Sequence, residues 1–401
     1  MSPSFSLPPV AQRLTKLPPY LFVQIDAMKE ALIKEGRDVI DMGVGDPDEP
    51  TPNVILQAMV KALKDRTNHQ YPSNRGLEAL RVAIARWYKK RFGVTLDPAT
   101  EILPLIGSKE GIAHLPLAYI NPGDRVLVPD PCYPPYRTGT ILAGGKPVAV
   151  PLLAESHFLP DLHALARKTD KAKLLFLNYP NNPTAAVADL KFFRQLVEFA
   201  HRTGVPICHD AAYSEITYGG FKHLSFLQVP GAKEVGIEFH SLSKTFNMTG
   251  WRIGWACGNQ QMISALAKVK SNIDSGVFQA IQIAGVHALQ DSGGHLKRML
   301  RIYQTRRDLM VGALQKAGWP IQPPKATFYL WAPIPKGRDS KQVAAELLQK
   351  QAIVATPGVG FGGHGEGYVR FSLSVPTPRI KEAAKRIRQL SIWPLHKHSS
   401  G

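Results

Sequence analysis

Strand-like runs alternate with amphipathic helical runs along most of this chain, and that alternation constrains the fold more than any other feature. The strand-like runs include residues 125–128, 173–178 and 205–210. The helical runs that separate these and neighbouring strands cover residues 109–120, 187–203 and 261–271. Alternation of this kind predicts an α/β fold, in which helices flank both faces of a mostly parallel sheet.

The length and the changing pattern of the chain predict two domains. Its 401 residues exceed the size at which single hydrophobic cores stop growing. The pattern changes near residue 295, where a basic helical run (295–317) is followed by strand-like runs at 327–331 and 368–373 and by further helices. We expect an N-terminal arm that joins the smaller domain, a large domain, a smaller α+β domain and a short tail. Their expected bounds are 1–50, 51–292, 293–393 and 394–401.

Composition favours a soluble cytoplasmic protein. No apolar run reaches the roughly 18 residues that span a membrane, and the N-terminus lacks the pattern of a signal peptide. Cys132, Cys208 and Cys257 are too few for a disulfide framework and fit a reducing compartment. The net charge is +18, but the basic residues are spread along the chain and no nucleic-acid module is visible. We therefore expect neither a nucleic-acid nor a membrane partner.

The segment 241–254 (Ser-Leu-Ser-Lys-Thr-Phe-Asn-Met-Thr-Gly-Trp-Arg-Ile-Gly) carries the strongest chemical signal. It places Lys244 beside the hydroxyls of Ser241 and Ser243, with Arg252 a short loop away. This set suits an aldehyde cofactor with a phosphate, because an amine condenses with the aldehyde while hydroxyls and a guanidinium hold the phosphate. Strand-like runs at 237–240 and 253–257 flank the lysine, so we expect it on a loop. The alternative is an ordinary solvated lysine.

This segment resembles the cofactor-lysine motif of the fold-type-I aminotransferases, which use pyridoxal 5'-phosphate (PLP). The resemblance covers about residues 20–374 and narrows to the LL-diaminopimelate aminotransferase family. It implies the fold-type-I architecture of PLP-dependent transferases, with PLP held by Lys244, Ser241, Ser243 and Arg252.

Two further motifs close strand-like runs. Asp210 ends one of them and Tyr213 follows, and ligands gather at the carboxyl ends of parallel strands. The resemblance implies that Asp210 binds the pyridine nitrogen and Tyr213 the ring hydroxyl, although Asp210 also suits a helix N-cap. Asn182, in the motif Asn-Tyr-Pro-Asn-Asn-Pro-Thr (178–184), is implied to contact the ring oxygen and the substrate, whereas alone the motif reads as a turn. Ala185 stands where many relatives have glycine, and alanine is awkward there if φ is positive.

Other residues complete the expected cofactor site. Ser108 and Lys109 precede a helical run, where free backbone N–H groups bind phosphate; a simple serine cap is the alternative. The resemblance implies that this pair binds phosphate and that Lys109 also contacts the substrate. It also implies that Tyr133 stacks on the cofactor ring and contacts the substrate, although a tyrosine in a Pro-rich loop is as well explained by packing. Tyr71 is implied to reach the phosphate of the neighbouring subunit's cofactor, which requires at least a homodimer.

The expected substrate contacts lie at the two ends of the chain. Arg370 follows a Gly-rich loop, and a guanidinium fork holds a carboxylate well. From its segment alone it reads as a surface arginine, but the resemblance implies that it binds the substrate's α-carboxylate. Gly45 matches a glycine that lets the substrate approach the backbone, and Tyr20 matches a substrate-contacting tyrosine.

Two other kinds of site are not expected. The run Gly-Phe-Gly-Gly-His-Gly (360–365) satisfies G-x-G-x-x-G, but that pattern indicates a dinucleotide site only when it follows a strand and opens a helix. Here a strand-like run follows. The 13 histidines show no metal-ligand spacing, so no metal is expected.

The resemblance implies a transaminase that exchanges an amino group between an amino acid and 2-oxoglutarate. LL-diaminopimelate, on the route to lysine, is the implied donor, because the runs 43–47, 106–112, 209–215 and 272–276 match beyond the general fold-type-I pattern. An alanine-type aminotransferase looks similar, especially around 107–111. A PLP β-lyase would share nearly every residue named above. A non-enzymatic regulator would carry a DNA-binding extension, and none is visible.

Overall fold

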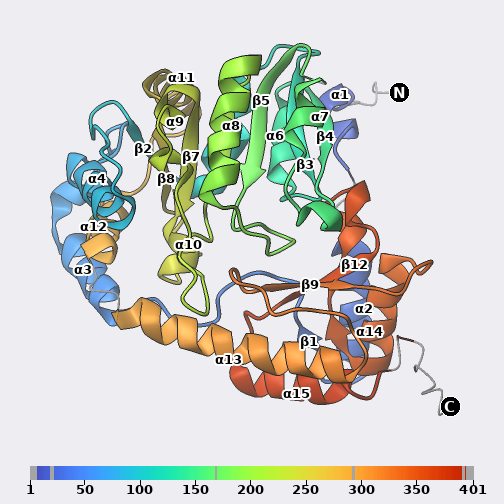
Figure 1. Ribbon diagram of the computed structural model, residues 1–401. Coiled ribbons are helices and arrows are strands. Elements are labelled where there is room, and N and C mark those ends of the chain that lie inside the picture. The colour runs from blue at the N-terminus through green and yellow to red at the C-terminus, as the bar shows by residue number, and fades with distance from the viewer. Residues whose placement is uncertain (1–6, 19–21, 168, 291–293, 391–392, 394–401) are drawn as a thin grey trace, which may run out of the picture.

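The computed structural model describes residues 7–18, 22–167, 169–290, 294–390 and 393. Its centre is a seven-stranded sheet with the strand order β2-β8-β7-β6-β5-β3-β4 (Figure 1). In that order the strands are Ile102–Leu105, Gly254–Gly258, Gly236–Ser241, Ile207–Asp210, Ala172–Asn178, Arg125–Asp130 and Lys146–Pro151. The strands β7, β6, β5, β3 and β4 pair in parallel, whereas β8 runs antiparallel to both β7 and β2. The predicted mostly parallel sheet is confirmed.

Helices cover both faces of this sheet, and its central strands are accordingly rich in buried apolar residues. On β5, Leu174 and Phe176 face one core and Leu175 and Leu177 face the other, as the two-residue repeat of a strand requires. The first core packs against α5 (Ser108–Tyr119), α6 (Pro135–Leu142) and α11 (Gln260–Lys270). The second packs against α3 (Asn53–Lys64), α4 (Glu78–Phe92), α7 (Leu162–Ala166), α8 (Leu190–Thr203), α9 (Ala232–Val235) and α12 (Gln279–Gln290).

Helix α8 shows how the sequence defines these elements. Asp189 caps its start by accepting a hydrogen bond from the backbone N–H of Phe192 at 2.8 Å. Gly204 ends it in the left-handed conformation, at φ 68°. Phe192, Phe193, Leu196 and Phe199 form the buried stripe between these two ends.

A third core belongs to the C-terminal part of the chain. It combines α13 (Gly294–Lys316), α14 (Ser340–Gln351) and α15 (Thr377–Ile387) with two small sheets. One small sheet has the order β11-β12-β9 (Thr356–Pro357, Tyr368–Ser372, Tyr329–Pro333), and the other pairs β1 (Ile40–Asp41) with β10 (Ile353–Val354). In Figure 1, α13 runs beneath the large sheet toward these elements. The pairing of β1 joins the N-terminal segment to this core, while the expected domain bounds stay a prediction.

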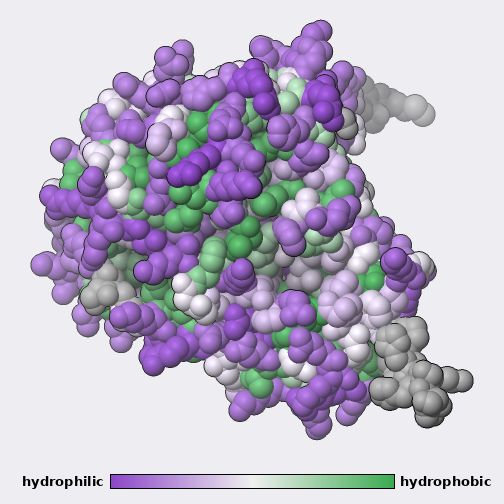
Figure 2. All heavy atoms as spheres, in the orientation of Figure 1, coloured by the Kyte–Doolittle hydropathy of each residue, from purple (hydrophilic) through white to green (hydrophobic). Residues whose placement is uncertain are grey.

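The remaining helices precede the large sheet in the sequence. Helix α1 covers Gln12–Thr15 and α2 covers Phe22–Lys34. Polar residues cover most of the face seen in Figure 2, and apolar residues show in patches among them. Among the described residues, no helix combines the length and apolarity needed to cross a bilayer.

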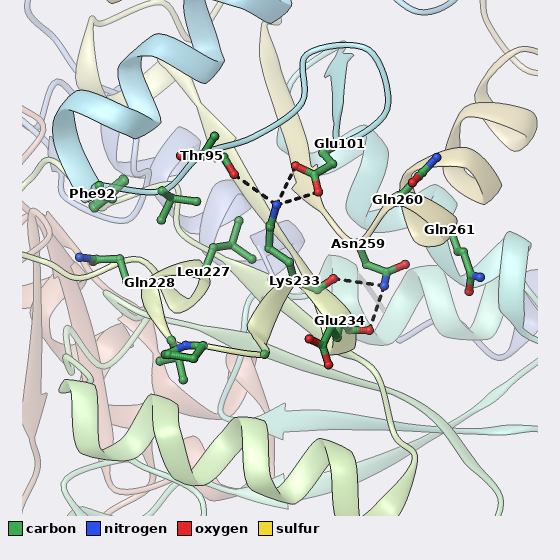
Figure 3. Close-up of a pocket in the computed structure, with 15 residues that line it drawn as sticks. Phe92, Thr95, Glu101, Leu227, Gln228, Lys233, Glu234, Asn259, Gln260 and Gln261 are labelled. Carbon is green, nitrogen blue, oxygen red and sulfur yellow. Dashed lines mark hydrogen bonds and ion pairs between the residues drawn. The ribbon is translucent and has the colours of Figure 1, made fainter.

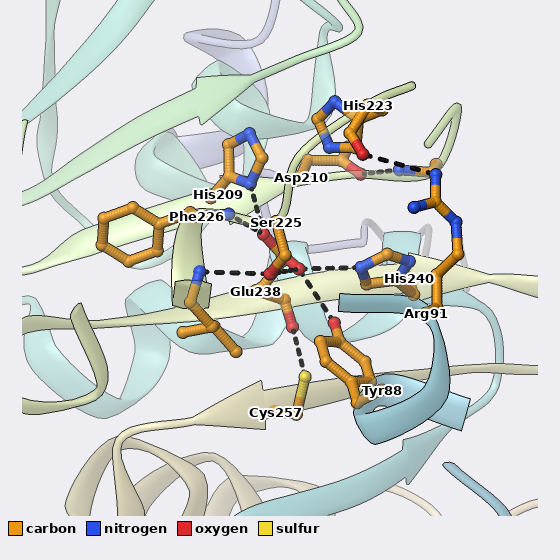
Figure 4. Close-up of polar contacts among 12 residues, drawn as sticks. Tyr88, Arg91, His209, Asp210, His223, Ser225, Phe226, Glu238, His240 and Cys257 are labelled. Carbon is orange, nitrogen blue, oxygen red and sulfur yellow. Dashed lines mark hydrogen bonds and ion pairs between the residues drawn. The ribbon is translucent and has the colours of Figure 1, made fainter. Parts of the chain in front are cut away.

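A buried polar network lies within the core on the α4 and α8 side of the sheet (Figure 4). The Glu238 carboxylate accepts hydrogen bonds at 2.8–2.9 Å from Tyr88 Oη, His209 Nδ1, Ser225 Oγ, Phe226 N and His240 Nε2. Burial raises the pKa of Glu238, but the hydrogen bonds and electrostatic influence of His209 and His240 outweigh it and hold that pKa well below its usual value. The ring of His223, also fully buried, has no hydrogen-bond partner on either nitrogen within the described structure. Burial therefore lowers the pKa of His223 and keeps its ring neutral.

Candidate active site

A cavity of about 410 Å³ lies where β5, β6 and β7 end, beside the C-terminal core. Parallel strands of an open α/β sheet place ligands at this edge. The cavity brings together twelve of the fourteen residues predicted from the sequence. They are Gly45, Ser108, Lys109, Tyr133, Asn182, Asp210, Tyr213, Ser241, Ser243, Lys244, Arg252 and Arg370.

Lys244 projects its amine into this cavity. It lies in α10, a four-residue helix (Leu242–Thr245), so the prediction of a loop was wrong. The helix forms because the Ser241 hydroxyl accepts a hydrogen bond from the backbone N–H of Ser243 at 3.1 Å and thereby caps its start. Lys244 Nζ donates to the carbonyl oxygen of Gly45 at 2.8 Å.

The electrostatic surroundings of Lys244 favour its neutral amine. Burial, together with the guanidinium groups of Arg252 and Arg370, lowers the pKa of Lys244 to about 8, against the opposing effect of Asp46. A lysine with this pKa is partly deprotonated near neutral pH, so it can act as a nucleophile and as a base.

One end of the cavity combines a helix N-terminus with cationic and hydroxyl groups. Ser108 begins α5, and Arg252 approaches it from the loop between β7 and β8. This approach requires glycine at two positions: a side chain at Gly107 would come within 2.5 Å of Arg252 Nη2, and one at Gly254 within 2.9 Å of Ser108 N. Backbone N–H groups, hydroxyls and a guanidinium at one point are the donors that a phosphate dianion needs.

The opposite side of the cavity carries a buried carboxylate. Asp210 Oδ2 accepts a hydrogen bond from Tyr136 Oη at 2.7 Å, and Oδ1 accepts one from Ala212 N at 3.2 Å. Burial raises the pKa of Asp210, whereas these hydrogen bonds act against the rise. A turn follows Asp210 instead of a helix, so the alternative role as a helix cap was wrong. Tyr136 is not predicted from the sequence, where its one signal is its position three residues after Tyr133.

Tyr329 also lines the cavity and is not predicted from the sequence. Its hydroxyl lies 2.8 Å from the hydroxyl of Tyr213. A side chain at Gly45 would collide with that same hydroxyl, so the predicted need for glycine at position 45 has a direct structural reason. Tyr329 starts β9, and no pattern in its segment indicates that it faces the cavity.

Arg370 is buried at 5% exposure, so its alternative reading as a surface arginine was wrong. Its Nη1 donates to Asn182 Oδ1 at 2.8 Å and its Nη2 to the Gly43 carbonyl oxygen at 2.6 Å. The rings of Tyr329 and Phe361 lie 4.2 and 4.6 Å from its guanidinium carbon. Its Nε has no partner within the described residues, which leaves a buried donor available to a ligand.

Two loops near the cavity bear on the sequence predictions. Ala185 follows the Asn182 turn with φ 58°, so the predicted difficulty of an alanine at a positive φ is confirmed. The Gly-rich run at 360–365 forms 3₁₀ turns that lead into β12, so it lacks the strand-to-helix context of a dinucleotide site, as predicted. At Gly362, φ is 136° and a side chain would collide with Asp130, which explains glycine there.

Two predicted residues remain, Tyr71 and Tyr20. Tyr71 is 88% exposed and does not line the cavity of its own chain. Tyr20 lies outside the described residues. The carboxylate-bearing residue Asp26, on α2, also lines the cavity and was not predicted.

A second hollow, of about 800 Å³, lies at the opposite edge of the sheet (Figure 3). It is lined by the residues around the start of β7 and the end of β8, and the ammonium of Lys233 is paired there with Glu101 at 2.8 Å. Because that lysine is already neutralised, this hollow lacks the free amine and the cationic end that distinguish the 410 Å³ cavity.

The 410 Å³ cavity contains the groups that PLP requires. A lysine amine of lowered pKa, a phosphate-binding end, a buried carboxylate and an aromatic residue, Tyr133, converge on one space. The buried donor at Arg370 is placed for a substrate carboxylate. The residues present therefore fit the cofactor, while their individual roles stay predictions.

The family model and the relatives that match this chain are all aminotransferases. Residues 37–387 match the family model described as aminotransferase class I and II. The chain is 54% identical to an LL-diaminopimelate aminotransferase of Desulforudis audaxviator, over 94% of this chain and 97% of that protein. It is 53% identical to the Aquifex aeolicus protein of the same name, over 95% and 99%.

A solved structure agrees with these relatives. Substrate-bound BacF from Bacillus subtilis has a TM-score of 0.90 and 36% identity, and the match covers 96% of this chain and 98% of that one. The fold, the lysine-centred cavity and the matched relatives lead to one conclusion: the chain belongs to the class I and II aminotransferases, and it is a PLP-dependent transaminase.

Proposed function

We propose that this transaminase moves an amino group from LL-diaminopimelate to 2-oxoglutarate, as a step in lysine biosynthesis. The observation that carries the chemistry is the Lys244 amine, whose pKa is lowered to about 8 inside a cavity with a phosphate-binding end. The choice of donor is supported by the names of relatives that are 50–54% identical over nearly the whole chain.

The proposed cofactor contacts divide between the two ends of the cavity. The phosphate is held by Ser108, Lys109, Ser241, Ser243 and Arg252, because these residues supply its hydroxyl and cationic donors.

The remaining contacts surround the cofactor ring. Asp210 holds the ring nitrogen, Tyr213 and Asn182 hold the ring oxygen, and Tyr133 packs on the ring. Tyr136 supports Asp210 through their 2.7 Å hydrogen bond, which fixes the position of that carboxylate.

When bound, PLP supplies an aldehyde for attachment to an amine and a ring that accepts the electrons of the substrate's α-carbon. Lys244 moves the proton to and from that carbon, since its pKa lies near the working pH. Arg370 binds the α-carboxylate, and its hydrogen bonds to Asn182 and Gly43 hold the guanidinium in place. Gly45 leaves room for the substrate, and Lys109 and Tyr133 also contact it. Tyr20 remains a proposed substrate contact on the strength of the resemblance.

The protein is proposed to work as a cytoplasmic homodimer with shared active sites. Helix α3 exposes Val54, Leu56, Val60 and Leu63 to solvent, and Tyr71 is 88% exposed nearby in the sequence. Apolar side chains gathered on one helix in this way suit a protein interface. A partner subunit on this face would give Tyr71 a binding partner, the phosphate of that subunit's cofactor. The three buried free cysteines fit a reducing compartment.

A donor assay tests this proposal. Purified protein is supplied with 2-oxoglutarate and, in turn, LL-diaminopimelate, alanine or aspartate, and glutamate formation is measured. We expect LL-diaminopimelate to give the highest kcat/KM. A preference for alanine would replace the proposed donor, and release of ammonia and pyruvate would indicate a β-lyase. Lys244→Ala should abolish turnover and the visible absorption of lysine-bound cofactor, while Lys268→Ala, on the exposed side of α11, should keep both.

A further inference from the structure

Lys270 is a buried lysine outside the cavity. It is the last residue of α11, and its side chain is 1% exposed. Its Nζ lies 2.6 Å from Asp274 Oδ1 and 3.2 Å from Glu110 Oε2. Lysine is almost never fully buried unless it is paired. This ammonium therefore joins two separate segments, the first turn of α5 and the loop after α11.

Glu110 connects the ammonium to the phosphate-binding end of the cavity. Its Oε2 also accepts a hydrogen bond from the backbone N–H of Ile106 at 2.9 Å, and its Oε1 lies 3.0 Å from His114 Nδ1. The Glu110 side chain thus spans the turn that carries Ser108 and Lys109. Glu110 therefore links Lys270 directly to this turn.

Asp274 connects the ammonium to the segment that carries Tyr71. Its Oδ1 accepts a hydrogen bond from Gly276 N at 2.7 Å. A side chain at Gly276 would lie 3.4 Å from Pro72 Cγ and from the Ser73 carbonyl oxygen, so this loop packs directly beside residues 72–73. Tyr71, the residue just before Pro72, is the one that we expect to reach the partner's cofactor.

The same cluster has the composition of a metal site, since ligand atoms of Glu110, His114 and Asp274 lie within 4.8 Å of one another. The Lys270 ammonium already pairs with both carboxylates. Its positive charge meets the need that a cation would otherwise meet, so the cluster is better explained as a link than as a metal site.

We propose that Lys270 is a positioning residue that couples the cofactor seat of one subunit to the contact between subunits. The proposal rests on the proposed function, in its PLP seat and its homodimer. Phosphate bound at Ser108 stabilises the first turn of α5, and Lys270 passes that order to the 271–276 loop and to Tyr71. Binding of PLP and association of subunits then strengthen each other, because both favour the same arrangement.

The test measures the dimer dissociation constant with and without PLP by analytical ultracentrifugation, for the wild type and for Lys270→Met. In the wild type, PLP should tighten the dimer about 10-fold, within the range usual for coupled sites. In Lys270→Met the ratio should fall to about one, because a neutral side chain holds neither carboxylate. The matched control Lys268→Met, on the exposed side of the same helix, should keep the wild-type ratio.

Reciprocity adds an independent readout. Because a dimer binds two PLP molecules, the PLP affinity per site, measured by absorbance or fluorescence, should differ between dilute monomer and concentrated dimer by the square root of that ratio, about threefold. If Lys270→Met does not fold, the same measurements on Asp274→Ala test the coupling. That change removes the bond between Lys270 and the 271–276 loop but leaves Lys270 paired with Glu110. That variant should lose the coupling while its monomer binds PLP within about twofold of the wild type.

The possible results separate failure of the coupling from failure of the proposed function. A wild-type ratio retained in Lys270→Met, or in Asp274→Ala if the first variant is unfolded, overturns the coupling and leaves the proposed function standing. A wild-type dimer that PLP does not tighten has the same meaning. A wild-type protein that takes up no PLP, or that stays monomeric at every concentration, overturns the proposed function together with the coupling.

Discussion

His223 should make the stability of this protein fall in mild acid. Its imidazole is fully buried, it has no hydrogen-bond partner on either nitrogen among the described residues, and it packs against the rings of His209 and Phe193. Burial, together with the nearby imidazole of His209, lowers its pKa well below the usual 6.5. The folded state therefore keeps this ring neutral at a pH where the unfolded chain protonates it.

The groups around His223 determine whether its pKa rises or falls on folding. Glu238 favours protonation of His223, but burial and the positive influence of His209, His240 and Arg91 outweigh it. Because the unfolded state binds the extra proton, the free energy of unfolding falls as pH falls below 6.5. One proton corresponds to about 1.4 kcal/mol per pH unit, so lowering the pH from about 7.5 to about 5.5 should remove about 1.4 kcal/mol through this residue.

The assay compares urea unfolding of the wild type and His223→Leu across this pH range. Protein and PLP concentrations stay fixed, because ligand and subunit binding also change apparent stability. The difference between the two unfolding free energies should change by about 1.4 kcal/mol in favour of the variant as the pH falls. The control His201→Leu replaces a half-exposed histidine on α8 and should follow the wild type. Parallel curves for the wild type and His223→Leu would refute the reasoning.

Two arginines give further predictions. Arg370→Lys should lower kcat/KM about 10- to 100-fold, because it removes a planar guanidinium fork whose hydrogen bonds are worth about 1.5–3 kcal/mol. The visible absorption of bound PLP should be kept. An unchanged kcat/KM would contradict the proposed binding of the substrate carboxylate by Arg370. Arg306→Met should lower the free energy of unfolding by about 3 kcal/mol, the low end of the cost of breaking a buried ion pair. The change leaves the Asp48 carboxylate without its partner, and solvent reaches that carboxylate only in part. Arg306 holds Asp48 through two hydrogen bonds at 2.6 and 2.8 Å. A loss below about 1 kcal/mol in urea unfolding would show that the Arg306 pair is not needed.

Much of the fold and site could be predicted because the signals are local. The strand and helix patterns placed the large sheet, and parallel strands bring the residues at their carboxyl ends to one edge. Asp210 ends such a strand, and Asn182 and Lys244 come a few residues after two others, so the fold brings the three into one cavity. The resemblance then added Arg370, whose segment alone had suggested a surface position.

The rest depends on contacts between distant segments. Tyr329 meets Tyr213 through the packing of the C-terminal core, and no spacing along the chain reveals such a partner. Tyr136 lies near Tyr133 in sequence, but only the fold shows which of them binds Asp210. Lys244 was placed on a loop because a four-residue helix is too short for its period to be visible.

The antiparallel course of β8 bears on the order in which the site assembles. A single hairpin, β7 and β8 with their connection, carries both Lys244 and Arg252, so the two meet after closure of a short loop. Arg370 and Asn182, by contrast, are 188 positions apart and meet only after the C-terminal strands have formed. A chain emerging from the ribosome would thus bring Lys244 and Arg252 together before Arg370 can reach Asn182.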